Sequence, residues 1–127
     1  MSEIPQPVAL KVHEDSRGRL FEFVRMLNDG QIFVCVTNSM SQRGGHYHTR
    51  KLERFLVVQG EAEIRLRKKG DNKVTRFYVR GDCPQVVDIP LNHVHDLMNV
   101  GKSDMILLVW ANEVFDPNDP DTFQEIV

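Results

Sequence analysis

Cysteine is scarce in this sequence of 127 residues, and neither Cys35 nor Cys83 stands in a CxxC motif or in a cluster with histidines. This scarcity argues against a disulfide scaffold and against a cysteine-based zinc site. It favours free thiols in a reducing, cytoplasmic compartment. We expect both thiols to be buried as small apolar groups.

Long apolar runs and an excess of one charge are also missing. The longest apolar run, Met105–Ala111, is far shorter than the ~20 residues of a membrane helix. Residues 1–7 are polar and lack the apolar core of a signal peptide. The formal net charge is −2 and the pI is ≈ 6.2, which gives no positive field for nucleic acid. We therefore expect no membrane and no nucleic acid among the partners.

The apolar residues alternate with a period of two, and no helical repeat persists along the chain. The clearest alternation is in Glu61–Lys68, where Ala62, Ile64 and Leu66 would face a core and the intervening charged residues would face water. A chain of this length suits one hydrophobic core. We expect a single domain over residues 1–127.

Further strands are predicted wherever the alternation recurs between turn residues. They cover residues 8–13, 20–24, 31–37, 55–58, 74–79, 86–89, 93–98 and 105–110. Residues 112–127 are predicted to form a turn-rich segment that covers the strands. Many short strands joined by tight turns indicate an all-β sandwich or closed barrel.

Histidines gather in two short segments. His46 and His48 are two residues apart, so on a strand both rings project from the same face. Glu53 has the opposite parity and can join them only if the chain turns within residues 49–52. His95 follows a proline turn at the start of another predicted strand. Three imidazoles and one carboxylate suit zinc, iron(II), manganese or nickel, and they leave coordination positions open.

Two motifs carry a family resemblance. From His46 the sequence reads HxH, four residues, Glu, six residues and Gly, and residues 90–99 place Pro, His95 and Asn in order. These segments resemble the two signature motifs of the cupin superfamily, which implies a double-stranded β-helix, or jelly-roll barrel, with the metal inside. Met40 and Asn92 stand where glycine is usual, and asparagine is well suited to a positive φ angle.

The resemblance extends beyond the metal motifs. Residues 13–22 and 38–47 look like segments of the nucleotide-sugar 3,5-epimerases, in which the histidine matching His46 is a base and no metal is bound. Residues 53–58, 86–90 and 110–117, together with the pair Asp121-Thr122, look like the C-terminal cupin domain of bifunctional capsule-synthesis enzymes. Those enzymes epimerise and then reduce a UDP-linked 2-acetamido-2,6-dideoxy-hexos-4-ulose. Because the other three ligand candidates are present, we expect His46 to be a ligand.

This second resemblance implies a metal-dependent C3 epimerase of a nucleotide sugar in capsule or O-antigen synthesis, holding one zinc ion and forming a homodimer. No Gly-rich dinucleotide fingerprint is present, so we expect no NAD(P), and a separate reductase would be a further partner. His93 stands where tyrosine is usual, and Thr49 where a further histidine is usual. Either difference can change which residues act as acid and base, or which substrate is bound.

Epimerisation beside a ketone requires groups that carry protons and a cation near the enolate. Lys51 could act as the base or stabilise the enolate, Tyr47 and His93 could carry protons, and Arg43 could contact a diphosphate. By parity Tyr47 should point away from the ligands. A nucleotide-sugar 3,4-ketoisomerase, an iron(II) oxygenase and a non-catalytic sugar-binding cupin remain as alternatives, because a fold alone does not settle an activity.

Overall fold

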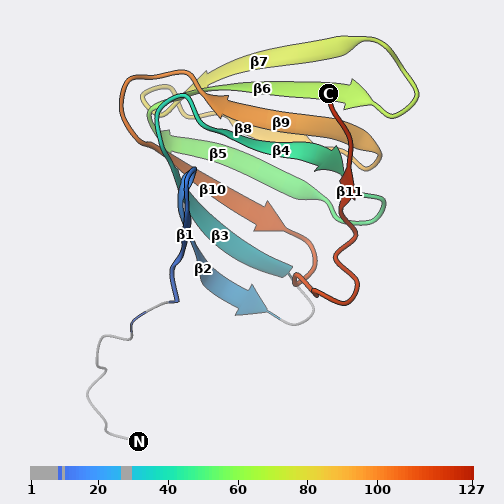
Figure 1. The fold of residues 1–127 in the computed structure, drawn as a ribbon, viewed down its shortest axis with the longest axis horizontal. Helices are drawn as coiled ribbons and strands as arrows, with labels where there is room; N and C mark the ends of the chain where they lie inside the picture. The colour runs from blue at the N-terminus through green and yellow to red at the C-terminus, as the bar shows by residue number, and fades with distance from the viewer. Residues whose placement is uncertain (1–8, 10, 27–29) are drawn as a thin grey trace, which may run out of the picture.

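The computed structural model describes residues 9, 11–26 and 30–127, and within them the regular structure consists of strands (Figure 1). The strands are β1 (His13–Asp15), β2 (Gly18–Met26), β3 (Gly30–Thr37), β4 (Gln42–Tyr47), β5 (Glu53–Gln59), β6 (Glu61–Lys68), β7 (Val74–Arg80), β8 (Val86–Ile89), β9 (His93–Asn99), β10 (Met105–Ala111) and β11 (Phe123–Gln124). No helix in these ranges has both the length and the apolar character needed to cross a membrane.

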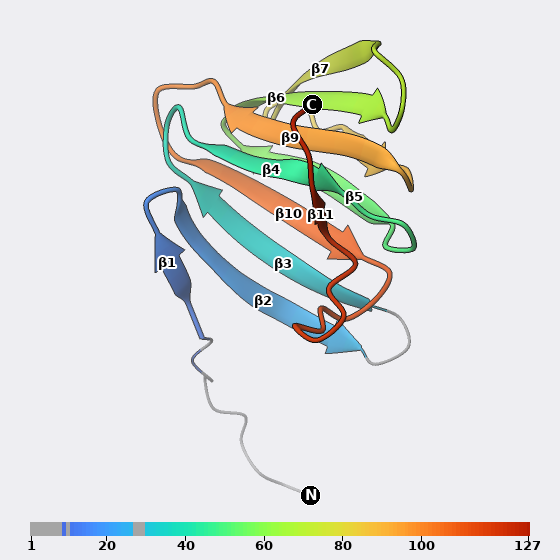
Figure 2. The same ribbon diagram turned by 45° about the vertical axis from the view of Figure 1, so that its right-hand side comes forward.

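The strands form two sheets that face each other. One sheet has the order β1-β2-β3-β10-β5-β8 and the other β11-β4-β9-β6-β7, and the pairings within both are antiparallel. Figures 1 and 2 show the two layers with β11 lying beside the end of β4. This is the arrangement of a jelly-roll barrel, and the expectation of an all-β jelly-roll is confirmed.

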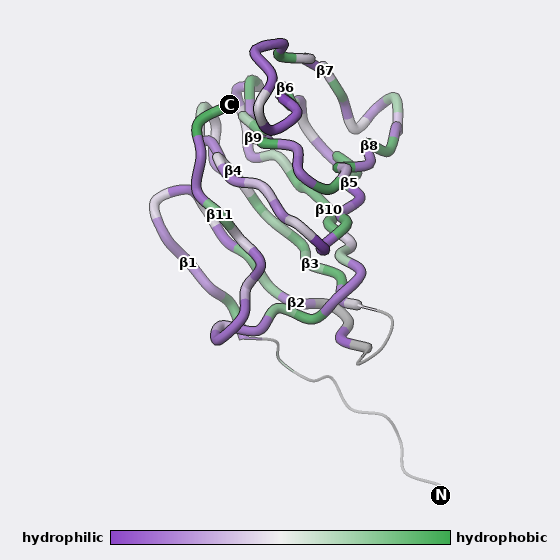
Figure 3. The backbone as a smooth tube through the Cα atoms, turned by 90° about the vertical axis from the view of Figure 1, so that its right-hand side faces the viewer, coloured by the Kyte–Doolittle hydropathy of each residue, from purple (hydrophilic) through white to green (hydrophobic). Residues whose placement is uncertain are grey.

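The core lies between the sheets and follows the alternation of the strands. In β6, Ala62 and Ile64 are completely buried, as the period-two pattern predicts. In β10, Met105, Leu107 and Val109 point inward and are buried. Figure 3 shows the neighbouring strands β3 and β10 as largely hydrophobic. Burial of this apolar surface is the main favourable contribution to folding.

Two tight turns use residues with positive φ angles. Asn92 has φ 58°, which confirms the expectation for this position. Its N–H donates to the carbonyl of His48 at 2.8 Å, so the turn before β9 is tied to the segment after β4. Met40, where the motif usually has glycine, also adopts a positive φ, of 62°. It is a rare conformation for an unbranched apolar residue.

Some expectations need correction. Residues 8 and 10 of the predicted strand 8–13 lie outside the described residues, and the first strand begins only at His13. The tail contains the short strand β11, which was expected to be irregular. Cys35 is buried as expected, whereas Cys83 is exposed, because it lies in the turn after β7, where it forms only an isolated bridge with Arg80.

A cavity-creating substitution tests the core. Ile64 is 0% exposed and Val58 is 51% exposed. We expect Ile64→Ala to lower the free energy of unfolding by about 2–5 kcal/mol, since it removes packed methylene groups and leaves a void. Val58→Ala should change it by no more than about 0.5 kcal/mol. Urea denaturation measures both values, and equal effects of the two substitutions would contradict this placement of the core.

Candidate metal centre

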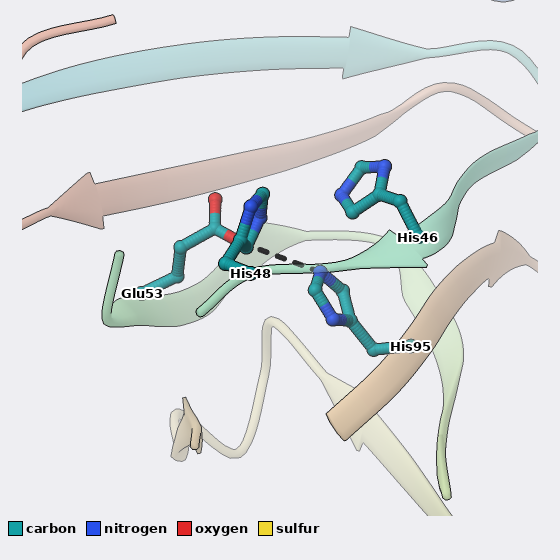
Figure 4. Close-up of side chains that lie close together, drawn as sticks. All are labelled: His46, His48, Glu53 and His95. Atoms are coloured by element: carbon teal, nitrogen blue, oxygen red, sulfur yellow. Dashed lines mark hydrogen bonds and ion pairs between the residues drawn. The ribbon is translucent and has the colours of Figure 1, made fainter. Parts of the chain in front are cut away.

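Four side chains from distant parts of the chain meet inside the barrel. They are His46 in β4, His48 just after it, Glu53 at the start of β5 and His95 in β9. One potential ligand atom from each lies within 4.8 Å of all the others. Figure 4 shows the three imidazoles and the carboxylate directed toward one another. The structure therefore brings together the four residues predicted as metal ligands.

The pairing of β4 with β9 places two of these ligands. His46 lies directly opposite His95, and the register shifts between Gly44 and His46 as in a β-bulge. Residues opposite each other project from the same face of a sheet, and the ring centroids lie 4.7 Å apart. Gly44 has φ +92°, and a Cβ atom there would lie 2.8 Å from the carbonyl oxygen of His95. Glycine therefore permits the close approach of the two backbones.

Backbone carbonyls orient two of the imidazoles. His48 Nδ1 donates to the carbonyl of Asp121 at 2.6 Å, and His95 Nδ1 donates to the carbonyl of His93 at 3.0 Å. A carbonyl can only accept, so in each ring Nδ1 carries the proton and Nε2 is directed to the cluster. Metal-binding histidines are usually held in this way.

The carboxylate of Glu53 lies between these two rings. Its Oε1 is 3.0 Å from Nε2 of His48 and 3.3 Å from Nε2 of His95. Burial alone would raise the pKa of Glu53, but the contacts with the two imidazoles outweigh burial and hold this pKa well below the usual range of a carboxyl group. Glu53 is therefore ionised at neutral pH.

The histidines differ in their response to this environment. Burial, together with the neighbouring His95 and His48, lowers the pKa of His46 to about 4. Burial would also lower the pKa of His48, but the hydrogen bond to Glu53 and its charge outweigh burial and raise it. His46 is thus neutral at pH 7, which is the form that binds a metal ion.

The donor set fits a divalent ion. Nε2 of His95 is buried and forms no hydrogen bond with any described residue, although Oε1 of Glu53 lies 3.3 Å away. An unsatisfied buried nitrogen is costly unless something binds it. Ligands at about 2.0–2.2 Å from a shared ion lie roughly 3–4.4 Å apart, so the observed cluster requires only small side-chain shifts to close around one.

The cluster forms part of the wall of a cavity of about 280 Å³. The remaining wall is largely apolar and includes Leu20, Phe33, Phe55, Leu97, Leu107 and Val109. Cys35 also faces this cavity, and burial raises the pKa of its thiol to about 11. That thiol stays protonated at neutral pH and is a poor nucleophile.

Two further predicted site residues line the same cavity. Lys51 is only 7% exposed, and its Nζ donates to the carbonyl of Pro120 at 3.2 Å and lies 5.3 Å from the ring centroid of Phe115. Arg43 donates through Nε to the hydroxyl of Thr37 at 2.7 Å. Within the described ranges no carboxylate lies within ion-pair distance of Arg43.

Tyr47 and His93, both predicted to carry protons, do not line this cavity. The Tyr47 ring stacks on Phe123 with centroids 5.2 Å apart, and Lys69 Nζ lies 4.5 Å from its centroid. The parity expectation for Tyr47 is therefore correct and its catalytic assignment has no geometric support. His93, opposite Lys68 at the start of β9, lines a separate groove between β7 and β8.

Comparison with known proteins places the chain in a family. Residues 13–123 match the family described as the polysaccharide biosynthesis C-terminal domain. The chain belongs to this family. Over 112 residues it is 36% identical to the UDP-2-acetamido-2,6-beta-L-arabino-hexul-4-ose reductase of Pseudomonas aeruginosa, and the match covers 88% of this chain and 30% of that protein.

Solved structures agree with this family assignment. The capsular polysaccharide assembling protein CapF of Staphylococcus aureus is 40% identical with a TM-score of 0.93, over 95% of this chain and 35% of CapF. An oxalate decarboxylase of Lactobacillus farciminis shares 20% identity with a TM-score of 0.68, over 82% of this chain and 31% of that one, which shows the fold alone. The chain thus spans about a third of these relatives, and its cupin resemblance is confirmed.

The sequence reasoning missed residues that the tail brings to the site. Phe115 and Thr122 line the cavity, and Asp121 contacts both the ligand His48 and the turn that follows it. Residues 112–127 were expected to be a cover, and the pair Asp121-Thr122 was noted only as part of the family resemblance. A buried aspartate in a turn-rich tail gives no local signal of its contacts.

Single substitutions test the metal site. We expect His46→Ala, His48→Ala, Glu53→Ala and His95→Ala each to reduce the metal bound after zinc loading, because each removes one ligand atom. Each should also abolish the rise in melting temperature that metal produces in the parent chain. Metal content by mass spectrometry and thermal melting with and without a chelator provide the two measurements.

The exposed His13 supplies the control. His13→Ala should keep both the metal and its stabilising effect. If the zinc-loaded parent chain holds no stoichiometric metal, or if metal does not restore stability after chelation, the assignment of these ligands is wrong.

Proposed function

We propose that this chain is a metal-dependent C3 epimerase of a nucleotide-linked 4-keto-6-deoxyhexosamine, acting in the cytoplasm in the synthesis of capsule or O-antigen sugars. The observation that supports this most strongly is the convergence of three histidines, Glu53 and buried Lys51 on one cavity. The names of the two relatives, a UDP-hexul-4-ose reductase and a capsular polysaccharide protein, support the substrate class and the pathway.

For this reaction the chain must stabilise the negative charge that develops on the substrate and must transfer protons. A divalent ion at His46, His48, Glu53 and His95 would supply a Lewis acid where negative charge develops on the substrate's carbonyl oxygen; zinc is the ion we propose. The C3 proton must leave, and a proton must return on the opposite face. We assign the exchange of the C3 proton to Lys51 Nζ, the titratable amine in the cavity.

The cavity also limits what can enter. At about 280 Å³ it lies at the small end of ligand sites, which span about 300–1,000 Å³. It suits a sugar ring, and we propose that the nucleotide lies outside it. The guanidinium of Arg43 is positioned by Thr37 and is not neutralised by a described carboxylate. Its charge is therefore available to the phosphate nearest the sugar, although Nη2 also approaches the carbonyls of Arg19 and Val36 at 3.4 Å.

Isotope exchange tests the reaction. In deuterium oxide, the zinc-loaded chain should introduce deuterium at C3 of a UDP-linked 4-keto-6-deoxy-N-acetylhexosamine without any nicotinamide cofactor. Formation of the enolate exposes this carbon to exchange whichever face is reprotonated. We expect Lys51→Met to slow the exchange by roughly 10²–10⁴-fold while zinc content stays unchanged. Mass spectrometry and proton NMR follow the label.

Lys69→Met is the matched control, because Lys69 is a largely exposed lysine outside the cavity. Its exchange rate should equal that of the parent chain. Exchange by Lys51→Met at the parent rate would reject the role of Lys51 alone. Absence of exchange with every 4-keto nucleotide sugar would reject the epimerase, and oxygen consumption with iron(II) would then favour the oxygenase. Label found together with a 3-keto product would favour the ketoisomerase.

We also propose that the chain forms a homodimer and that a separate reductase uses its product. β1 ends one sheet, and the described part of the chain offers no strand to its outer edge. Unpaired edges favour association with another strand. Light scattering at micromolar concentration should give about twice the mass of 14.7 kDa. A mass of one chain under these conditions would refute the dimer.

A further inference from the structure

Asp121 lies near the C-terminus, yet it is only 3% exposed. Its carboxylate accepts hydrogen bonds from the backbone N–H groups of Thr49, Arg50 and Lys51 at 2.8–3.1 Å. It also accepts one from the hydroxyl of Thr49 at 2.5 Å. These three residues belong to the turn that joins β4 to β5. One carboxylate thus satisfies several donors of the turn that separates two ligands, His48 and Glu53.

The backbone of Asp121 makes a second contact with the site. Its carbonyl accepts the Nδ1 proton of His48 at 2.6 Å, which directs Nε2 of this ring to the cluster. The residue has φ +48°, a left-handed conformation that aspartate and asparagine tolerate better than most residues do. The side chain and the carbonyl of one residue therefore act on the turn and on the ligand that precedes it.

Neighbouring residues of the tail add to this arrangement. The carbonyl of Pro120 accepts a hydrogen bond from Lys51 Nζ at 3.2 Å. On the other side of Asp121, β11 pairs with β4 opposite His46 and Tyr47. The tail thus contacts the ligand strand, the turn and the buried lysine, with Asp121 at the centre of these contacts.

We propose that Asp121 is a positioning residue of the metal centre. Glu53 has the opposite parity to the two histidines of β4, so the turn must adopt one conformation to bring its carboxylate to their side. The Asp121 carboxylate selects that conformation by satisfying the N–H groups of the turn, and its carbonyl holds the His48 ring. Outer partners of this kind commonly change metal affinity by about 10–100-fold. The proposal rests on the proposed metal site.

The test is Asp121→Asn, which keeps the size of the side chain and the tolerance for positive φ. It replaces one acceptor oxygen by an NH₂ group that cannot accept from the turn. Co²⁺ serves as the probe, because its visible spectrum reports ligand geometry. We expect Asp121→Asn to bind Co²⁺ roughly 10–100-fold more weakly than the parent chain, with a changed spectrum and faster hydrogen exchange at the amides of residues 49–51.

Asp116→Asn is the matched control, since Asp116 is an exposed aspartate of the same tail whose carboxylate caps the N–H of Asn118. It should keep the affinity and the spectrum of the parent chain. If Asp121→Asn leaves both unchanged, or if Asp116→Asn weakens binding equally, the positioning role is wrong even where amide exchange rises. If the parent chain itself binds no Co²⁺, the proposed metal site fails and the positioning role with it.

A second variant covers the case in which Asp121→Asn does not fold, as judged by circular dichroism. Thr49→Val removes only the hydroxyl that donates to Asp121 and keeps the branched side chain on an exposed residue. We expect it to weaken Co²⁺ binding by a few-fold, since one hydrogen bond to a carboxylate is lost. Unchanged affinity and spectrum in this variant would overturn the proposal.

Discussion

The antiparallel pairing of β4 with β9 places His46 opposite His95, and the other features of the site depend on this register. A slip by one residue would turn each side chain of a strand to the other face of the sheet. The bulge at Gly44 absorbs the mismatch between the two strands, and only glycine allows the backbone to pass so close to His95. The geometry of the centre is thus set by backbone contacts before any side chain is considered.

Burying the polar and charged side chains of the centre inside the barrel has an electrostatic cost in free energy. A carboxylate and three imidazoles are held among apolar residues, and Phe55 lies with its ring centroid 6.0 Å from that of His95. Removing such groups from water is unfavourable, and the contacts of Glu53 with His48 and His95 offset this cost for the carboxylate. The nitrogen left without a partner, Nε2 of His95, is where a cation would be most stabilising.

The cavity beside the centre and the groove between β7 and β8 differ in chemistry. The cavity beside the centre combines apolar walls with Lys51 and Arg43, whereas the groove between β7 and β8 contains His93 and exposed side chains such as Phe77 and Val86. The side chain of Lys51 has little access to water, so a positive charge on its amine acts more strongly on a bound anion than the charge of a surface lysine would. The reaction proposed above makes use of this contrast, because its intermediate is an anion.

The sequence alone determined the features that depend on local period and spacing. The alternation in β6 predicted which of its side chains are buried, the two-residue spacing of His46 and His48 predicted a shared face, and the glycine position taken by Asn92 predicted its positive φ. These properties follow from the geometry of a strand or a turn, which a short segment carries by itself.

Only the tertiary structure decided which residues surround that face. His93 and His95 share a parity and lie two residues apart on β9, yet His93 lines the groove between β7 and β8 whereas His95 belongs to the centre. Asp121 reaches His48 across 73 positions of sequence, and no local pattern encodes such a contact. Its place depends on how the tail packs after β10, because hydrogen bonds between distant segments form only where the packed sheets bring their donors and acceptors together.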